Sequence, residues 1–209
     1  MKKNILLIIF LISANLLFSQ KQVIISDAAI TYAIKGSDAE TNTNLTGSVK
    51  QFYIKGKMSR IDINAQGYKQ SVITNDKTGI TVILKEIGSE KYISTFNAEE
   101  WKHENRRFEG LTLALTNETK TILGYQCKKA IAKLKDGSSY SIYYATSVMP
   151  SVSENYYQFK DVPGLVLEYE TYGNSNQSKI SYSAATINFS PVPAMMFEIP
   201  KAGYRILKH

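Results

Sequence analysis

Short runs of alternating apolar and polar residues, each ended by a turn, recur along most of the chain. Alternation with a period of two places successive side chains on opposite faces of a β-strand. Asp136-Gly137 lies between two such runs and is a strong hairpin signal. The pattern therefore predicts a mainly β protein with an antiparallel sheet. The expected strands cover 22–35, 48–55, 58–64, 69–75, 79–85, 91–95, 112–123, 125–135, 138–147, 165–172 and 177–189.

The sequence predicts few helices. The stretches 97–110 and 151–161 are the only segments that favour a helix, and both are short. Residues 36–44 are polar and are expected to form a loop. The sequence contains no internal repeat and no Pro/Gly-rich linker, so residues 21–209 are predicted to form a single domain.

The N-terminus has the layout of a secretory signal peptide. Lys2 and Lys3 precede an apolar run over 5–12, and small and polar residues follow at 19–20. The run is shorter than the roughly 18 to 20 apolar residues that span a bilayer. Removal of residues 1–20 is expected to leave an exported protein without a transmembrane segment. The protein is expected to be in the periplasm, associated with the outer membrane, or extracellular.

The chain has one cysteine, Cys127, and a formal net charge of +7. An exported protein with a single cysteine has no internal disulfide, and the thiol is expected to be a small buried apolar group. No cysteine lies near the expected cleavage site, so a lipid-modified N-terminus is not expected. The basic residues are spread along the chain without forming a stripe, and we therefore expect no nucleic-acid partner.

Sequence motifs for catalysis or metal binding are missing. His103 and His209 are the only histidines, and neither has the spacing of a zinc site. Glu168 and Glu170 alternate along one expected strand face, as surface ion-pair partners do. The sequence therefore predicts no catalytic residue, no metal site and no cofactor. A hydrolase of unknown type is the less favoured alternative.

The expected hairpin can be described in more detail. A two-residue turn at Asp136-Gly137 would pair Lys135 with Ser138. In that register Ala130 lies opposite Tyr143. One face of the hairpin then consists largely of small side chains, which would admit a packed helix, a second strand layer or a ligand. That face comprises Ala130, Ala132, Ser139 and Ser141.

Several expected strands have one apolar and one charged face. Arg60 and Asp62 point away from one apolar face, which consists of Phe52, Ile54, Ile61 and Ile63. Glu168 and Glu170 point away from another, which consists of Leu165, Leu167 and Tyr169. Two short helices cannot cover all of this apolar surface, so the sheet must curl strongly or leave a groove. A groove of this kind would hold a lipid or another apolar ligand. The predicted ligand-binding residues are Phe52, Ile54, Ile61, Ile63, Ala130, Ala132, Tyr143, Leu165, Leu167 and Tyr169.

One stretch of the chain is similar to known families. Residues 118–130 contain a Lys-x-Ile-x-Gly-Tyr-x-Cys-x-Lys-Ala pattern, which is followed by 134–137, 142–146 and a Pro-Gly-Leu pattern within 162–169. This stretch resembles an uncharacterised family of exported Bacteroidota proteins grouped with LolA-like folds. Its motifs are also similar to those of the GLPGLI family, although the signature of that family is replaced here by Val162-Pro163-Gly164-Leu165-Val166.

The resemblance implies a fold and a kind of function. The implied fold is a LolA-like half-barrel, a strongly curved antiparallel sheet with a few short helices, as in periplasmic carriers of acylated lipoproteins. The implied function is the binding of a lipid or acyl chain without catalysis, and an envelope protein is a further expected partner. The alternative is a structural or protein-interaction module of the cell envelope whose interior is filled by its own side chains.

Overall fold

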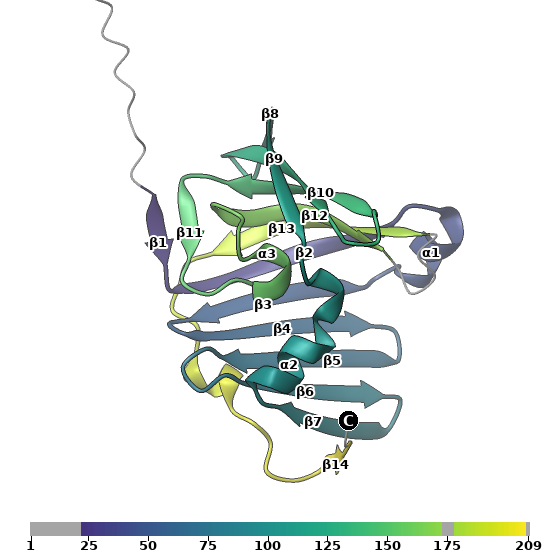
Figure 1. Cartoon of the computed structure of the whole chain (residues 1–209). Coiled ribbons are helices and arrows are strands. Elements are labelled where there is room, and N and C mark those ends of the chain that lie inside the picture. Colours follow the sequence, from purple (N-terminus) through teal and green to yellow (C-terminus); the bar gives the residue numbers. More distant parts are fainter. Residues whose placement is uncertain (1–21, 173–177, 208–209) are drawn as a thin grey trace, which may run out of the picture.

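Twelve strands form one large sheet in the computed structural model, which describes residues 22–172 and 178–207 (Figure 1). The predicted signal peptide, residues 1–20, lies outside the described residues. The strands of the sheet are β2 (Asp27–Gly36), β3 (Val49–Lys55), β4 (Met58–Ala65), β5 (Tyr68–Asn75), β6 (Ile80–Ile87), β7 (Glu90–Phe96), β8 (Thr112–Ile122), β9 (Tyr125–Lys133), β10 (Ser139–Ala145), β12 (Leu165–Tyr172), β13 (Lys179–Asn188) and β14 (Arg205–Ile206).

The strands follow the spatial order β14-β7-β6-β5-β4-β3-β2-β13-β12-β10-β9-β8. Neighbours run antiparallel except for β14, which pairs with β7 in parallel. A separate parallel pair is formed by β1 (Val23–Ile25) and β11 (Val148–Pro150). The sheet is curved, and its upper strands turn toward the helices in Figure 1. The predicted fold class, mainly β with a curved antiparallel sheet and few helices, is confirmed.

Short helices lie on one face of this sheet. Figure 1 shows α2 (Ala98–Glu104) and α3 (Tyr156–Phe159) in front of the strands, and the 3-10 turn η1 (Arg106–Phe108) follows α2. Both helices fall within the stretches that the sequence favours. The start of α2 is fixed by Asn97, whose side chain accepts hydrogen bonds from the backbone amides of Glu99 and Glu100. The Glu100 carboxylate accepts from the Asn97 amide in return, which completes a capping box.

A further helix replaces an expected loop. Within residues 36–44, α1 (Ala39–Asn44) forms one short helix at the end of β2. Its N-cap is Asp38, whose Oδ1 accepts a hydrogen bond from the backbone amide of Thr41 at 2.8 Å. An N-cap carboxylate of this kind satisfies a helix donor that would otherwise be unpaired. The prediction of a loop was therefore wrong for residues 39–44.

The hairpin between β9 and β10 has a different register from the predicted one. Leu134 pairs with Ser138, and Gly137, at φ 87°, takes the left-handed conformation as the third residue of the loop. This extra loop residue shifts every pair by one position and changes which side chains face each other. Ala130 therefore lies opposite Ile142, and Ala132 opposite Tyr140. The predicted face of small side chains is wrong, because the alanines pack against large apolar residues.

The opposite face of the lower strands also differs from the prediction. Arg60 and Asp62 form an ion pair at 2.7 Å with side chains only 20% and 13% exposed, so that side is not left in water. The segment after β13 covers it: Val192 and Phe197, the latter in the 3-10 turn η2 (Ala194–Phe197), pack with Leu84 of β6. The outer face of these strands is therefore covered by the segment after β13.

Among the described residues, no helix has the length and apolar character needed to cross a membrane.

Candidate functional site

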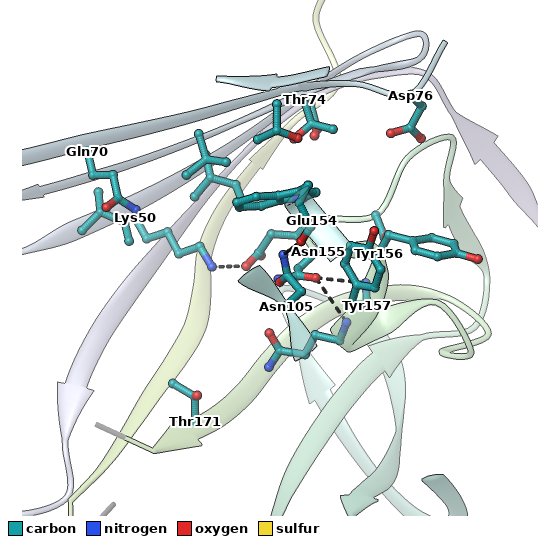
Figure 2. A pocket seen from close by; sticks show the side chains of 18 of the residues that line it. Lys50, Gln70, Thr74, Asp76, Asn105, Glu154, Asn155, Tyr156, Tyr157 and Thr171 are labelled. Carbon is teal, nitrogen blue, oxygen red and sulfur yellow. Dashed lines mark hydrogen bonds and ion pairs between the residues drawn. The ribbon is translucent and has the colours of Figure 1, made fainter. Parts of the chain in front are cut away.

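A cavity of about 540 Å³ lies between the sheet and the two helices on its inner face (Figure 2). Its floor comes from β3 to β6 and one wall from α2. Another wall comes from residues 153–158, which are the loop before α3 and most of α3 itself. Tyr169 of β12 and Tyr182 of β13 line it from the other half of the sheet. The volume falls within the range of about 300 to 1,000 Å³ that is typical of small-ligand sites. This cavity is the candidate functional site.

Strand register builds the floor of the cavity in rows. Ile61 of β4 pairs with Val72 of β5 to make an aliphatic row. Lys50, Ile63 and Gln70 form the next row across β3, β4 and β5. All of these side chains line the cavity, and Ile61 and Ile63 are only half-buried. The floor therefore offers an aliphatic strip with hydrogen-bonding groups beside it.

The walls are aromatic and polar. Trp101 of α2 lines the cavity and packs at 5.5 Å, between ring centroids, against Phe96 at the end of β7. Asn105 and the half-buried Tyr157 add an amide and a second ring to the wall. Aromatic rings with amide and hydroxyl groups around an aliphatic floor suit a ligand that has both an apolar body and polar groups.

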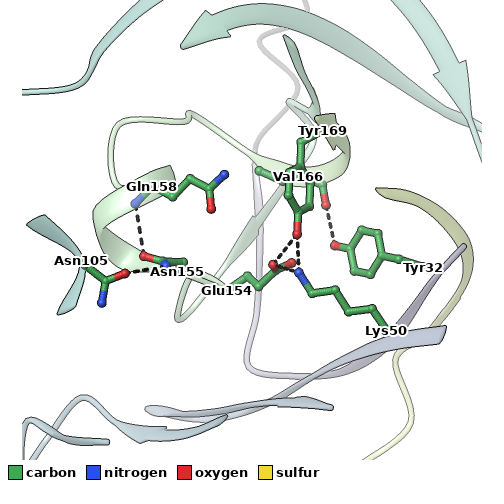
Figure 3. A network of polar contacts seen from close by, with 8 residues as sticks. All are labelled: Tyr32, Lys50, Asn105, Glu154, Asn155, Gln158, Val166 and Tyr169. Atoms are coloured by element: carbon green, nitrogen blue, oxygen red, sulfur yellow. Dashed lines mark hydrogen bonds and ion pairs between the residues drawn. The ribbon is translucent and has the colours of Figure 1, made fainter. Parts of the chain in front are cut away.

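A buried ion pair is part of the cavity lining, and Figure 3 shows its polar contacts. The ammonium group of Lys50 contacts the carboxylate of Glu154 and the hydroxyl oxygen of Tyr169. The Tyr169 hydroxyl donates a hydrogen bond to Glu154 Oε1 at 2.8 Å. The side chains of Lys50 and Glu154 are only 5% and 6% exposed. The pair thus joins β3, β12 and the loop that carries α3.

Three tyrosine rings surround the ammonium group of Lys50. Its Nζ lies 5.6 Å from the ring centre of Tyr32, 4.9 Å from that of Tyr169 and 4.7 Å from that of Tyr182. The last two rings are stacked with their centroids 4.8 Å apart. Ring faces attract a cation, which partly replaces the water that Lys50 loses on burial. The rings therefore support the buried charge of the pair.

Burial controls the protonation of these groups. It lowers the pKa of Lys50, an effect that the Glu154 carboxylate opposes. Burial raises the pKa of Tyr32 and Tyr169 well above the ordinary value, and the charge of Glu154 raises both further. The same causes raise the pKa of Tyr182 to about 12. The three phenols are therefore uncharged hydrogen-bonding groups at neutral pH.

Hydrogen bonds hold the loop that carries Glu154. The Ser151 hydroxyl donates to the carbonyl oxygen of Gly56 at 2.6 Å, which fixes the start of the loop to the β3–β4 turn. Asn155 caps α3 by accepting from the backbone amide of Gln158 at 3.2 Å. The Asn155 side chain also donates to Asn105 Oδ1 at 2.9 Å, which ties the loop to the end of α2. These bonds hold Glu154 against the sheet.

The two oxygens of Glu154 are used unequally. Oε1 accepts hydrogen bonds from Lys50 and Tyr169, whereas the buried Oε2 has no hydrogen-bond partner within the described part of the chain. Glu154 also lines a second cavity of about 250 Å³, whose walls include Phe52, Phe159 and other apolar groups. The carboxylate therefore stands where a mixed polar cavity meets a more apolar one.

The predicted ligand-binding residues divide into three groups. Ile61, Ile63 and Tyr169 line the larger cavity. Phe52 and Leu165 line the smaller one. The remaining five lie elsewhere: Ile54, Ala130, Ala132 and Leu167 are fully buried in the core, and Tyr143 is hydrogen-bonded to Glu118 on an exposed part of the sheet.

The predicted apolar face of β12 is interrupted. The pairing register shifts opposite Tyr143 and Tyr144 of β10. As a result Leu165 and Leu167 pack in one core cluster, whereas Tyr169 packs in another together with Val166. The expectation that Leu165, Leu167 and Tyr169 share one face was wrong for this reason.

Sequence reasoning missed the ion pair. Lys50 shares the strand face of Phe52 and Ile54, so a lysine in an inward position was the one available signal. Nothing local marks Glu154, because it lies in a loop and meets Lys50 only in the folded chain. The described residues also contain no group of three or more histidine, cysteine or acidic residues placed to hold a metal ion.

Two other expectations concern residues outside the cavity. Cys127 is fully buried, and burial raises the pKa of its thiol to about 11, so the expected buried cysteine is confirmed. Glu168 and Glu170 form ion pairs with Lys120 at 2.7 Å and with Lys179 at 3.3 Å. The two glutamates are therefore ion-pair partners on the sheet, as predicted.

A comparison with protein families finds a match over most of the chain. The model for the N-terminal domain of the N-glycanase peptide family, PNGase F-II, matches residues 32–188. No curated protein matches the chain.

Solved structures share the fold at low sequence identity. Two crystal forms of PNGF-II align with TM-scores of 0.50 and 0.53 and identities of 14% and 15%. They cover 86% and 87% of this chain but 30% and 32% of PNGF-II, so the chain spans about a third of that protein. An uncharacterized conserved protein from Thermus thermophilus aligns with a TM-score of 0.52 and 6% identity over 88% of this chain and 91% of its own.

The LolA-like expectation finds a weaker counterpart. A putative outer membrane lipoprotein-sorting protein domain from Vibrio parahaemolyticus aligns over 82% of this chain and 89% of its own, at 10% identity. Its TM-score of 0.24 is too low to carry an argument. Membership of a Bacteroidota or GLPGLI family stays a prediction.

Proposed function

Because the chain belongs to the family of N-glycanase peptide N-terminal domains, we propose that it is a ligand-binding domain of the cell envelope without catalytic activity of its own. The alignment covers only 30% and 32% of PNGF-II, so the proposal does not extend its activity to this chain. The charged start and short apolar run of the sequence support export to the envelope.

The cavity on the inner face of the sheet carries this proposal. Its aliphatic floor, with Ile61 and Ile63 half-buried, is open to the cavity space instead of being covered by the helices. Burying apolar ligand surface there would contribute about 25 cal/mol per Å² of surface removed from water. The proposed ligand is amphipathic, with an apolar body on this floor and polar groups among the amides and hydroxyls of the walls.

The rival function, an interaction module with a self-filled interior, accounts for part of the structure. Ala130, Ala132 and Leu167, which were predicted to line the ligand site, are packed in the core. The lower half of the sheet is different, because the floor formed by Ile61, Ile63 and Val72 borders a cavity. This difference favours the ligand-binding function, at a site nearer to β4 and β5 than the sequence predicted.

Binding of a neutral apolar fluorophore tests the proposal. Delipidated protein is titrated with N-phenyl-1-naphthylamine, and saturable fluorescence enhancement is expected. Ile63→Glu places a charge on the cavity floor and should weaken binding at least about tenfold, because a charge in an apolar site is strongly disfavoured. Ile87→Glu is the matched control, since Ile87 lies at the exposed end of β6 outside the cavity. No uptake by the wild type, or equal binding by both variants, would refute the proposed function.

A further inference from the structure

We propose that the cavity selects ligands whose polar end is an uncharged hydrogen-bond donor, such as a hydroxyl-rich head, and that Glu154 is the residue that recognises it. The inference rests on the proposed function and deepens it, because it names the chemistry of the ligand at the same site. Its starting point is the unequal use of the two carboxylate oxygens of Glu154.

A buried carboxylate oxygen normally has a hydrogen-bond partner. Burying an acceptor without one costs free energy, and such groups are few in native proteins. Oε2 of Glu154 is buried and has no partner among the residues that the structure describes, although the side chain is only 6% exposed. The residue Glu154 also lines both cavities. A donor that enters from a cavity would therefore complete the hydrogen bonding of Glu154.

Three neighbouring donor groups of the protein are bonded to other acceptors. The Lys50 ammonium contacts Oε1 and the Tyr169 hydroxyl within its cage of tyrosine rings. The hydroxyl proton of Tyr169 is directed at Oε1. The side-chain amide of Asn155, the next residue in the loop, donates to Asn105. In the observed geometry none of these donors reaches Oε2.

The charge of the site favours a neutral donor. Lys50 already balances the charge of Glu154, so a cationic ligand would add an uncompensated charge to a buried place. An anionic ligand would meet the Glu154 carboxylate, whereas Asp76, which lines both cavities, is exposed to water and repels an anion only weakly. Arg107 on the cavity wall is exposed to water and therefore attracts an anion only weakly. A hydroxyl group donates to Oε2 without changing the charge.

The surroundings of Glu154 suit the junction of an amphipathic molecule. On one side is the larger cavity, where Gln70 and Thr74 on the floor can exchange hydrogen bonds with further hydroxyl groups. On the other side is the smaller cavity, lined by Phe52, Phe159 and Leu165. The point where a polar head joins an apolar body therefore matches the position of the carboxylate.

Head-group competition on the whole protein tests this inference. Decyl β-D-glucoside, undecanoate and decyltrimethylammonium all carry a ten-carbon alkyl chain. The glucoside has a polyol head, and the other two have an anionic and a cationic head that cannot donate a hydrogen bond. Each is used, below its micelle-forming concentration, to displace bound N-phenyl-1-naphthylamine. The glucoside should displace the probe at a concentration at least about tenfold lower than either ionic compound, as expected for one hydrogen bond to a charged acceptor.

A second measurement on the wild type uses a ligand that lacks only the hydrogen-bond donors of the glucoside. Decyl glucoside with its four hydroxyls methylated keeps the shape and the acceptors but cannot donate. It should displace the probe about tenfold less well than the parent glucoside, for the same reason. Equal displacement by the two compounds would overturn the inference, whatever the behaviour of any variant.

A double variant tests the role of Glu154. Lys50→Met with Glu154→Leu removes the acceptor without leaving an unpaired buried charge. This variant should still bind the fluorophore but lose the preference for the glucoside. The matched control is Lys129→Met with Glu118→Leu, which removes an ion pair of 2.9 Å outside the cavity and should keep the preference.

The possible failures are distinguishable. If the wild type does not take up the fluorophore, the proposed function fails and the inference falls with it. If the fluorophore binds but the three head groups displace it equally, or the Lys50/Glu154 double variant keeps the glucoside preference, the inference fails while the proposed function stands.

Discussion

Lys50 and Glu154 are separated by 104 residues in the sequence, yet they form the buried ion pair that joins β3 to the loop before α3. Removing one partner of such a pair leaves an uncompensated charge in the interior, whereas replacing both by apolar residues is often close to neutral. The pair therefore gives a sharp test of how the loop is held.

The single variant Glu154→Leu should lower the free energy of unfolding by about 3–5 kcal/mol, because it leaves the Lys50 ammonium buried without a counter-charge. The double variant Lys50→Met with Glu154→Leu should recover most of this loss. Denaturant unfolding followed by circular dichroism measures both. A double variant as unstable as the single one would contradict the buried pairing.

The β9–β10 hairpin has no spare room at its alanines. Ala132 is fully buried opposite Tyr140, so Ala132→Trp should lower the free energy of unfolding by at least about 1–3 kcal/mol through overpacking. Lys133→Trp is the control, because the adjacent side chain is exposed on the other face. Had the predicted face of small residues existed, Ala132→Trp would be tolerated.

The capping box of α2 supports a wall of the cavity. Asn97→Ala removes the side-chain acceptor for the Glu99 and Glu100 amides and should cost about 1 kcal/mol of folding stability. Asn97→Asp keeps an acceptor and should be close to the wild type. Equal losses in the two variants, measured by thermal unfolding, would show that the cap does not stabilise α2.

Cys127 should react slowly and weaken the fold at alkaline pH. Its pKa is raised from 9.0 to about 11, mainly by burial, so little thiolate forms in the folded protein at neutral pH. The unfolded thiol loses its proton first, so the contribution of Cys127 to stability is complete below pH 9 and declines as the pH rises toward 11.

Cys127→Ala provides the matched measurement. It should cost about 1–2 kcal/mol at neutral pH from lost packing and make the free energy of unfolding fall less steeply above pH 9. Rapid stoichiometric labelling of the folded wild type at neutral pH would contradict the buried, protonated thiol.

Export can be tested on the protein from its native host. The charged start and short apolar run predict cleavage near residues 19–20. Intact-mass analysis of the envelope fraction should show a chain without these residues and without an added acyl mass. A species that keeps the first 15 residues would contradict the signal peptide.

Much of the sheet could be predicted because period-two alternation is a local signal. All eleven expected strand regions contain strands, and Asp136-Gly137 is correctly placed in a turn. The register of that hairpin could not be predicted, since Asp-Gly fits loops of two or three residues. A difference of one loop residue changes which side chains of β10 share a face with the alanines of β9. Because of the wrong register, Ala130 and Ala132 were predicted to belong to the ligand site, although they lie in the core.

The polar part of the site depends on contacts that no local pattern reveals. Lys50 interrupts an apolar strand face and could have been recognised as an inward charge. Glu154 could not, because its environment is created by β3, β12 and the end of α2 together. The cover on the outer face was missed for a related reason: residues 190–204 have neither a helical nor a strand period, although Val192 and Phe197 are buried.

That outer cover has a consequence for how the chain can fold. Val192 and Phe197 shield strands made more than a hundred residues earlier, and β13 fills the place beside β2. A polypeptide that leaves the ribosome or crosses a membrane with its N-terminus first therefore exposes the apolar outer surface of β5 and β6 until almost all of it has emerged. Contacts between residues so far apart in the sequence form slowly, and the partly folded intermediates are prone to aggregation. Biogenesis of this protein should accordingly depend on a holding chaperone.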